Sequence, residues 1–238
     1  MVKLTTRRSL AGPGAIAVVV LLAACASSSS PAPLNATLTA DGQSSATLQV
    51  LTGTRELKID MANLTASGAL VRVTTPAGGP APQLRLAGPG APGNGLVYLS
   101  AKGASAVTIT LSSAVSWRLD LGGGTQQTVA NLRGGQVTGI AFTAGSDVID
   151  LTLPRPHGSV PVRLAAGASQ FLVSLPGGVP VRLTAAGGAG EITLDGANHV
   201  GVAGGSVFTT AGWAPGAAGF DIDATAGAAR VAVTTWSS

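Results

Sequence analysis

Hydrophobic and polar residues alternate over short segments through most of the chain. Trp117, Leu119 and Leu121, for example, alternate with Arg118 and Asp120. The same period of two recurs in four other segments: Ile149–Leu153, Phe171–Leu175, Glu191–Asp195 and Arg230–Trp236. Successive side chains of a strand point to opposite faces of a sheet, so this pattern predicts half-buried β-strands bounded by Gly or Pro.

The spacing of glycines argues against helices. Between Gly122 and Gly227 the longest glycine-free stretch is Ser146–His157, and Pro154 and Pro156 interrupt it. An average helix of about 11–12 residues does not fit there. We therefore expect residues 37–238 to be all-β, built of short strands with Gly/Pro turns, with 37–115 and 116–238 as possible sub-halves.

A short internal echo suggests how the strands are arranged. Val160–Leu164 (VPVRL) recurs letter for letter as Val179–Leu183, nineteen residues later, and an Ala-Ala-Gly follows soon after each copy. A repeat of about twenty residues is typical of a repetitive β-solenoid or β-roll, in which each unit buries its apolar face against its neighbours. A β-sandwich that reuses one hairpin is the alternative.

Three glycine-bounded segments carry a resemblance to a known family: Trp117–Gly123, Ser174–Val181 and Gly190–Gly196. Together they resemble the bacterial toast-rack and adhesin-like repeat proteins, over about half the chain. The resemblance implies a glycine-rich β-solenoid and a location at the cell envelope. It implies no catalytic residue, because its shared motifs are turn glycines and inward aliphatics.

The first 24 residues have the parts of a secretory leader. Lys3, Arg7 and Arg8 form a basic start, and Ala15–Ala24 is an unbroken apolar run. Ten apolar residues are too few for a membrane span of about 20, but they fit a signal peptide, here expected as a short helix. Thr6–Leu10 also partly resembles a twin-arginine export motif, so the export route stays open.

The leader ends in Leu22, Ala23, Ala24 and Cys25, and Cys25 is the single cysteine of the chain. These four residues resemble the bacterial lipobox. That resemblance implies cleavage before Cys25, a diacylglyceryl group on its thiol and acylation of the new amino group. The alternative is an ordinary secreted protein cut at an Ala-x-Ala site. Residues 25–36, rich in Ser and Pro, are expected to be a tether.

The net charge argues against nucleic acid as a partner. The chain has 14 Lys and Arg against 10 Asp and Glu, but three of the basic residues lie in the leader. The mature chain would then carry 11 basic and 10 acidic residues, a net charge of +1. No basic stripe for phosphates is predicted.

Two glycine-rich motifs match known sites only superficially. Gly88–Gly93 has the letters of a dinucleotide-binding loop, but two prolines remove N–H donors and a strand follows, so we expect a turn and no nucleotide. Gly187–Leu194 resembles a calcium β-roll repeat with its acid one position early. Asp221 and Asp223 share one strand face, where a solvated surface is favoured over a weak ion site. No metal and no cofactor are expected.

Catalytic groups are sparse. His157 and His199 are the two histidines, and a triad of His157 with Ser146 or Ser159 and Asp147 or Asp150 is the best available, although His157 lies in a predicted turn. A pair of converging carboxylates would indicate an enzyme. The acids to check are Asp120, Asp147, Asp150, Glu191, Asp195, Asp221 and Asp223.

Trp213, between two glycines, is the aromatic residue singled out as a possible exposed binding residue, against core or end-cap packing. We therefore expect a non-enzymatic lipoprotein outside the cytoplasm, anchored to the membrane by lipid. It would act as an adhesin-like binding or scaffold module for an envelope protein or polysaccharide. A cell-wall or polysaccharide-active enzyme on a β-helix is the alternative. High Gly and Ala usage favours a bacterial, actinobacterial source.

Overall fold

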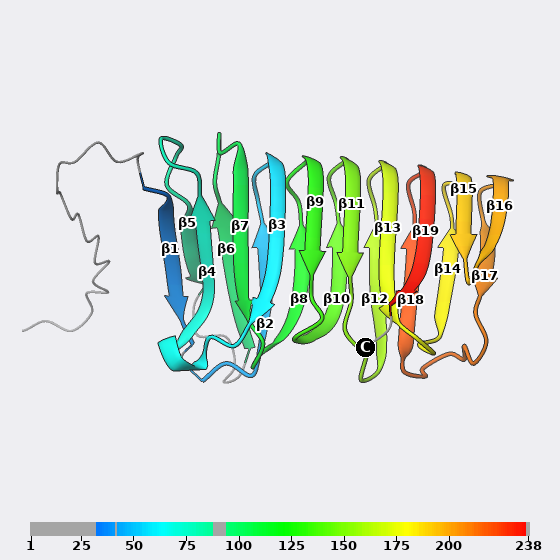
Figure 1. The fold of residues 1–238 in the computed structure, drawn as a ribbon, viewed down its shortest axis with the longest axis horizontal. Coiled ribbons are helices and arrows are strands. Elements are labelled where there is room, and N and C mark those ends of the chain that lie inside the picture. The colour runs from blue at the N-terminus through cyan, green and yellow to red at the C-terminus, as the bar shows by residue number, and fades with distance from the viewer. Residues whose placement is uncertain (1–31, 41, 88–93, 237–238) are drawn as a thin grey trace, which may run out of the picture. The chain divides into compact units, whose positions relative to one another are not determined.

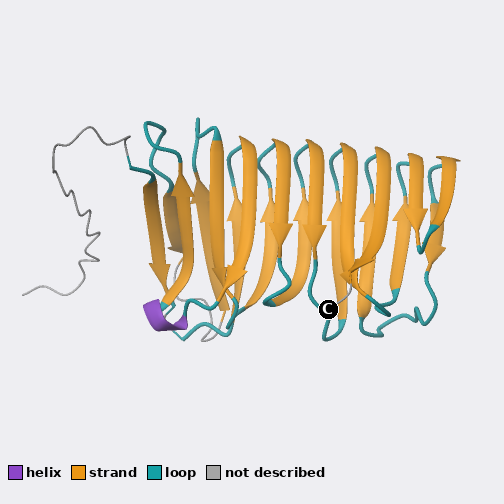
Figure 2. Cartoon of the chain, in the orientation of Figure 1, coloured by secondary structure: helices purple, strands orange, loops and turns teal. Residues whose placement is uncertain are grey.

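The computed structural model describes residues 32–40, 42–87 and 94–236. Apart from one 3₁₀ turn at Thr65–Ser67, every regular element in these ranges is a β-strand (Figure 2). The prediction of an all-β domain is confirmed. The signal-peptide helix, the lipobox, Cys25 and the Gly88–Gly93 turn lie outside the described residues.

The described strands form two mixed sheets (Figure 1). Sheet A has ten strands, in the spatial order β1 (Leu34–Thr39), β4 (Ala69–Thr75), β7 (Ala106–Ser112), β3 (Thr54–Ala62), β9 (Thr125–Asn131), β11 (Ser146–Thr152), β13 (Ala168–Pro176), β19 (Ala228–Trp236), β15 (Ala189–Leu194) and β16 (Ala197–Val202). Sheet B has nine, in the order β17 (Ser206–Thr209), β14 (Val181–Ala185), β18 (Gly219–Ala224), β12 (Ser159–Leu164), β10 (Gln136–Phe142), β8 (Ser116–Leu121), β2 (Ser45–Val50), β6 (Asn94–Ser100) and β5 (Gln83–Ala87).

In the middle of the domain the chain alternates between the sheets. From β8 to β13 each strand lies in the other sheet from the one before it and pairs in parallel with the strand two positions along. Ser146, for example, pairs with Thr125 on one side and Ala168 on the other. The pairing therefore stacks chain segments about twenty residues apart, the spacing of the sequence echo.

The two copies of the echo are not direct neighbours, however. Val162 in β12 and Leu183 in β14 both pair with Ile222, because β18 lies between their strands. In sheet A, β19 likewise lies between β13 and β15. The chain thus leaves a gap in both sheets and fills it with its last two strands.

Antiparallel strands close both ends of the sheets. At one end β1 pairs with β4 and β5 with β6, and at the other β16 pairs with β15 and β17 with β14. Because β1 begins at Leu34, the last three residues of the expected tether are hydrogen-bonded into sheet A. The described residues, 32–40, 42–87 and 94–236, belong to one compact unit.

The core fills the space between the sheets. Trp117 and Phe220 from sheet B and Phe171 from sheet A are its largest fully buried side chains, and Phe142 meets Phe171 edge to face at 6.1 Å. The inward residues are those that the alternation of period two predicts, because one face of each strand must bury apolar area.

Glycines stack where the chain turns from sheet B into sheet A. The turns before β3, β9, β11, β13 and β19 each contain a glycine that lies against the next turn: Gly53, Gly124, Gly145, Gly167 and Gly227. A Cβ on Gly53 would lie 2.7 Å from the carbonyl oxygen of Gly124. Glycine is therefore required at this position by the close approach of two backbones.

Candidate functional site

Trp213 lies in the loop between β17 and β18, and its side chain is partly exposed. The backbone N–H of Trp213 donates to the carbonyl of Thr210, which turns the loop back toward sheet B. The guanidinium carbon of Arg182 is 6.0 Å from the centroid of the indole ring. Trp213 is therefore held at the outward face of β14, and it is not part of the core.

Arg182 connects Trp213 to a carboxylate. Its Nε lies 3.0 Å from Oδ1 of Asp221, on the neighbouring strand β18 and in register with it. Neither atom has a hydrogen-bond partner, so the contact is an ion pair whose N–H does not point at the oxygen. Both side chains remain partly exposed, at 42% and 31%, where such a pair contributes at most about 1 kcal/mol.

Two residues farther along the same strands, and on the same face, Thr184 pairs in register with Asp223. Thr184 Oγ1 and Asp223 Oδ1 are buried and lack hydrogen-bond partners within the described structure. We call Trp213, Arg182, Asp221, Thr184 and Asp223 the outer patch. It combines an aromatic ring, hydrogen-bond donors and acceptors on one sheet face.

The outer patch gives no sign of an ion site. Asp221 faces Arg182, and Arg163 pairs in register with Asp223 from the other side. Among the described residues no group of three or more His, Cys, Asp or Glu gathers as a metal site would require. Asp221 and Asp223 thus each lie beside an arginine, and neither aspartate lines any of the three cavities described for the domain.

The structure does not bring Ser146 to His157. Ser159 begins β12, two residues after His157, and no hydrogen bond joins the two side chains in the described structure. Ser146 lies at the start of β11, where its hydroxyl contacts Thr125 and donates to the carbonyl of Val148. His157 is exposed and lies in the loop beyond the other end of that strand. The length of β11, about 20 Å, therefore separates Ser146 from this loop. His199 instead lies against Phe208, at 4.7 Å between ring centroids, where β16 and β17 close the domain.

The other candidate acids are dispersed over the surface. Asp120 pairs with Arg118 on its own strand, and Glu191 lies 3.9 Å from Arg230 on the next strand. Asp147 lines a shallow depression beside Gly145 and Gly167. Each of the three described cavities is lined by at most one carboxylate.

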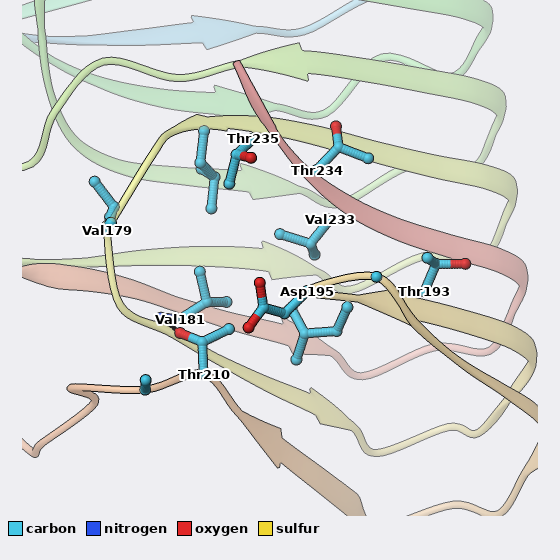
Figure 3. A pocket seen from close by; sticks show the side chains of 13 residues that line it. Val179, Val181, Thr193, Asp195, Thr210, Val233, Thr234 and Thr235 are labelled. Atoms are coloured by element: carbon cyan, nitrogen blue, oxygen red, sulfur yellow. Dashed lines mark hydrogen bonds between the residues drawn. The ribbon is translucent and has the colours of Figure 1, made fainter. Parts of the chain in front are cut away.

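A cavity of about 430 Å³ lies near the β16–β17 end (Figure 3). We call it the end cavity. Its walls are apolar, its rim carries threonines, and the Asp195 side chain reaches into it. The sequence pattern does not predict this cavity. It does mark the hairpin at its edge, because Asp195-Gly196 is a strong hairpin signal. Both residues have positive φ, 51° and 78°, as a type I′ turn requires.

A crystal structure described as that of a "putative cell adhesion protein" from Clostridium sporogenes resembles this chain in fold. The TM-score is 0.63 with 16% sequence identity, over 87% of this chain and 100% of that one. No protein-family model and no curated protein matches the chain. Within the described ranges, no helix is long and apolar enough to cross a bilayer.

Proposed function

We propose that this chain is a lipid-anchored bacterial lipoprotein, located outside the cytoplasm, whose all-β domain is a non-enzymatic binding module. The lipobox-like Leu22–Cys25 segment supports the anchor, since dual acylation gives durable membrane attachment. The fold it shares with the Clostridium sporogenes protein supports an adhesin-like role.

We further propose that the two sheets are the two sides of a flattened β-solenoid. It is supported by the alternation of strands between two sheets from β8 to β13 and by the parallel pairing of each strand with the one two positions along. Stacked coils of this kind give an extended, regular surface suited to binding.

The observation that carries the binding role is the outer patch. Trp213 offers a partly exposed indole, and Arg182 and Asp221 lie beside it on one sheet face. An aromatic ring covers the C–H face of a sugar, while guanidinium and carboxylate groups bind its hydroxyls. With Arg163 included, two arginines balance the two aspartates, which suits an uncharged polysaccharide of the envelope.

The dispersion of the acids supports a binding role over the enzyme alternative. Glycosidases need two carboxyl groups flanking one bond. Asp221 and Asp223 are adjacent on one face, but Asp221 is ion-paired with Arg182 and neither lines a described cavity.

The test is cosedimentation of the full chain with purified cell-wall polysaccharide from the producing bacterium. Trp213→Ala should weaken binding about tenfold or more, the scale of an aromatic hot spot. Tyr98→Ala is the matched control, because Tyr98 lies on the same face of sheet B near its other end. Wild-type protein that fails to bind, binding that Trp213→Ala leaves unchanged, or hydrolysis of the polysaccharide would overturn the proposal.

A further inference from the structure

The end cavity exists because neighbouring strands differ in length. In sheet A, β15 ends at Leu194, which pairs with Val233 of β19. β19 continues to Trp236 alongside β13 and has no β15 partner over its last three residues. The loop into β14 and residue Thr210 form the facing wall. The core is thus left open at this edge.

The lining divides into an apolar part and a polar part. Val179, Val181, Leu194 and Val233 are buried side chains that form much of the walls. Four threonines, Thr193, Thr210, Thr234 and Thr235, also line the cavity. The Thr210 hydroxyl accepts from the backbone N–H of Val181, and the Thr234 hydroxyl contacts that of Ser174. A ligand with an aliphatic body and a polar end matches this division.

Asp195 supplies the one formal charge in this lining. Its carboxylate reaches into the cavity (Figure 3), and no ion pair in the described structure involves it. The type I′ turn accounts for its backbone, but an asparagine satisfies that turn as well. The turn alone therefore does not require a negative charge here.

We propose that the end cavity binds a primary alkylammonium group, with its methylene chain along the valines and its ammonium at Asp195. An ammonium carries three N–H donors and a positive charge, and the Asp195 carboxylate supplies both an acceptor and the opposite charge. Aliphatic stems of amines pack along apolar walls while the charged head stays near water. This site goes beyond the proposed function, since it involves none of the residues of the outer patch.

The probe is pentylammonium, followed by amide NMR shifts of the labelled full chain. We expect saturable shifts at Thr193, Gly196 and Thr235. Pentanol, of similar length without charge, should bind at least tenfold more weakly, a difference of about 1.4 kcal/mol. Asp195→Asn should remove this difference, because it keeps the turn and deletes the charge. Folding of the variant is checked by its amide spectrum.

Two further arms identify the source of the amine. Comparing a blocked lysine tripeptide with pentylammonium distinguishes a peptide side chain from a free amine. Comparing the tripeptide with its Nε-acetylated form tests the need for the charge. Both comparisons use wild-type protein alone. Tighter binding of the lysine peptide than of its acetylated form supports the site without relying on any variant. Equal binding of pentylammonium and pentanol, shifts confined to other regions, or no shift at millimolar ligand would overturn the proposal.

Discussion

At the scale of single residues, Trp117 and Trp213, two of the three tryptophans, show how position decides what an aromatic ring does. Trp117 is fully buried, and its indole N–H donates to the carbonyl of Ser112 at 2.9 Å. Trp213 is partly exposed and contacts Arg182 at the surface. One ring therefore contributes to folding, and the other is available to a ligand.

Replacing these rings should separate stability from binding. Trp117→Ala leaves a large cavity and removes the indole hydrogen bond to Ser112, so it should lower the free energy of unfolding by about 3–5 kcal/mol. Trp213→Ala should lower it by less than about 1 kcal/mol, because its contact with Arg182 is long and exposed. Urea denaturation of both variants checks this. A similar loss in both would place Trp213 in the core.

Residue by residue, alternation predicts burial well because it is local. Leu119 and Leu121 are buried as their pattern indicates. The outer patch could not be predicted in this way, because Arg182 and Asp221 meet through a strand pairing 39 residues apart along the chain. The i, i+2 spacing of Asp221 and Asp223 predicts that they share one strand face, but it does not predict which arginines lie beside them.

At the scale of elements, the turn glycines allow neighbouring turns to stack closely. Gly53 lies so close to Gly124 that a methyl group would collide with backbone, while a Cβ on Gly158 would have no other atom within 4 Å. Both are turn or loop glycines without a positive φ. The space available to an added methyl group therefore distinguishes them.

Gly53→Ala should destabilise the domain by about 1–3 kcal/mol, as other overpacked sites do. Gly158→Ala should be neutral or stabilise it by up to about 1 kcal/mol, because alanine restricts the unfolded chain. Thermal unfolding of the two variants measures the difference. Equal midpoints would mean that the stacked turns adjust freely.

The spatial order of the strands does not follow from the sequence alone. The echo of Val160–Leu164 in Val179–Leu183 indicates related strands, and both are in sheet B. Nothing local indicates that β18 inserts between them. Ile222 is buried and pairs in register with both Val162 and Leu183, a relation between segments that are up to 60 residues apart along the chain.

At the scale of the whole molecule, the outer patch lies far from the end of sheet B at which β5 is found. β14 is seven strand spacings from β5, or about 34 Å at about 4.8 Å per strand. β1, the first described strand, pairs with β4 at the same end of the domain as β5. The outer patch and the first described strand therefore lie toward opposite ends of the two sheets.

The binding role requires the domain to be outside the cell, so the intact mass of the mature protein is the most direct test of the account. We predict a chain that begins at Cys25 and carries the added mass of a diacylglyceryl group and an N-acyl chain. Cys25→Ser is the control and should be recovered without lipid and away from the membrane fraction. A mature wild-type chain that starts at Met1, or that starts after the leader without lipid, would contradict the account.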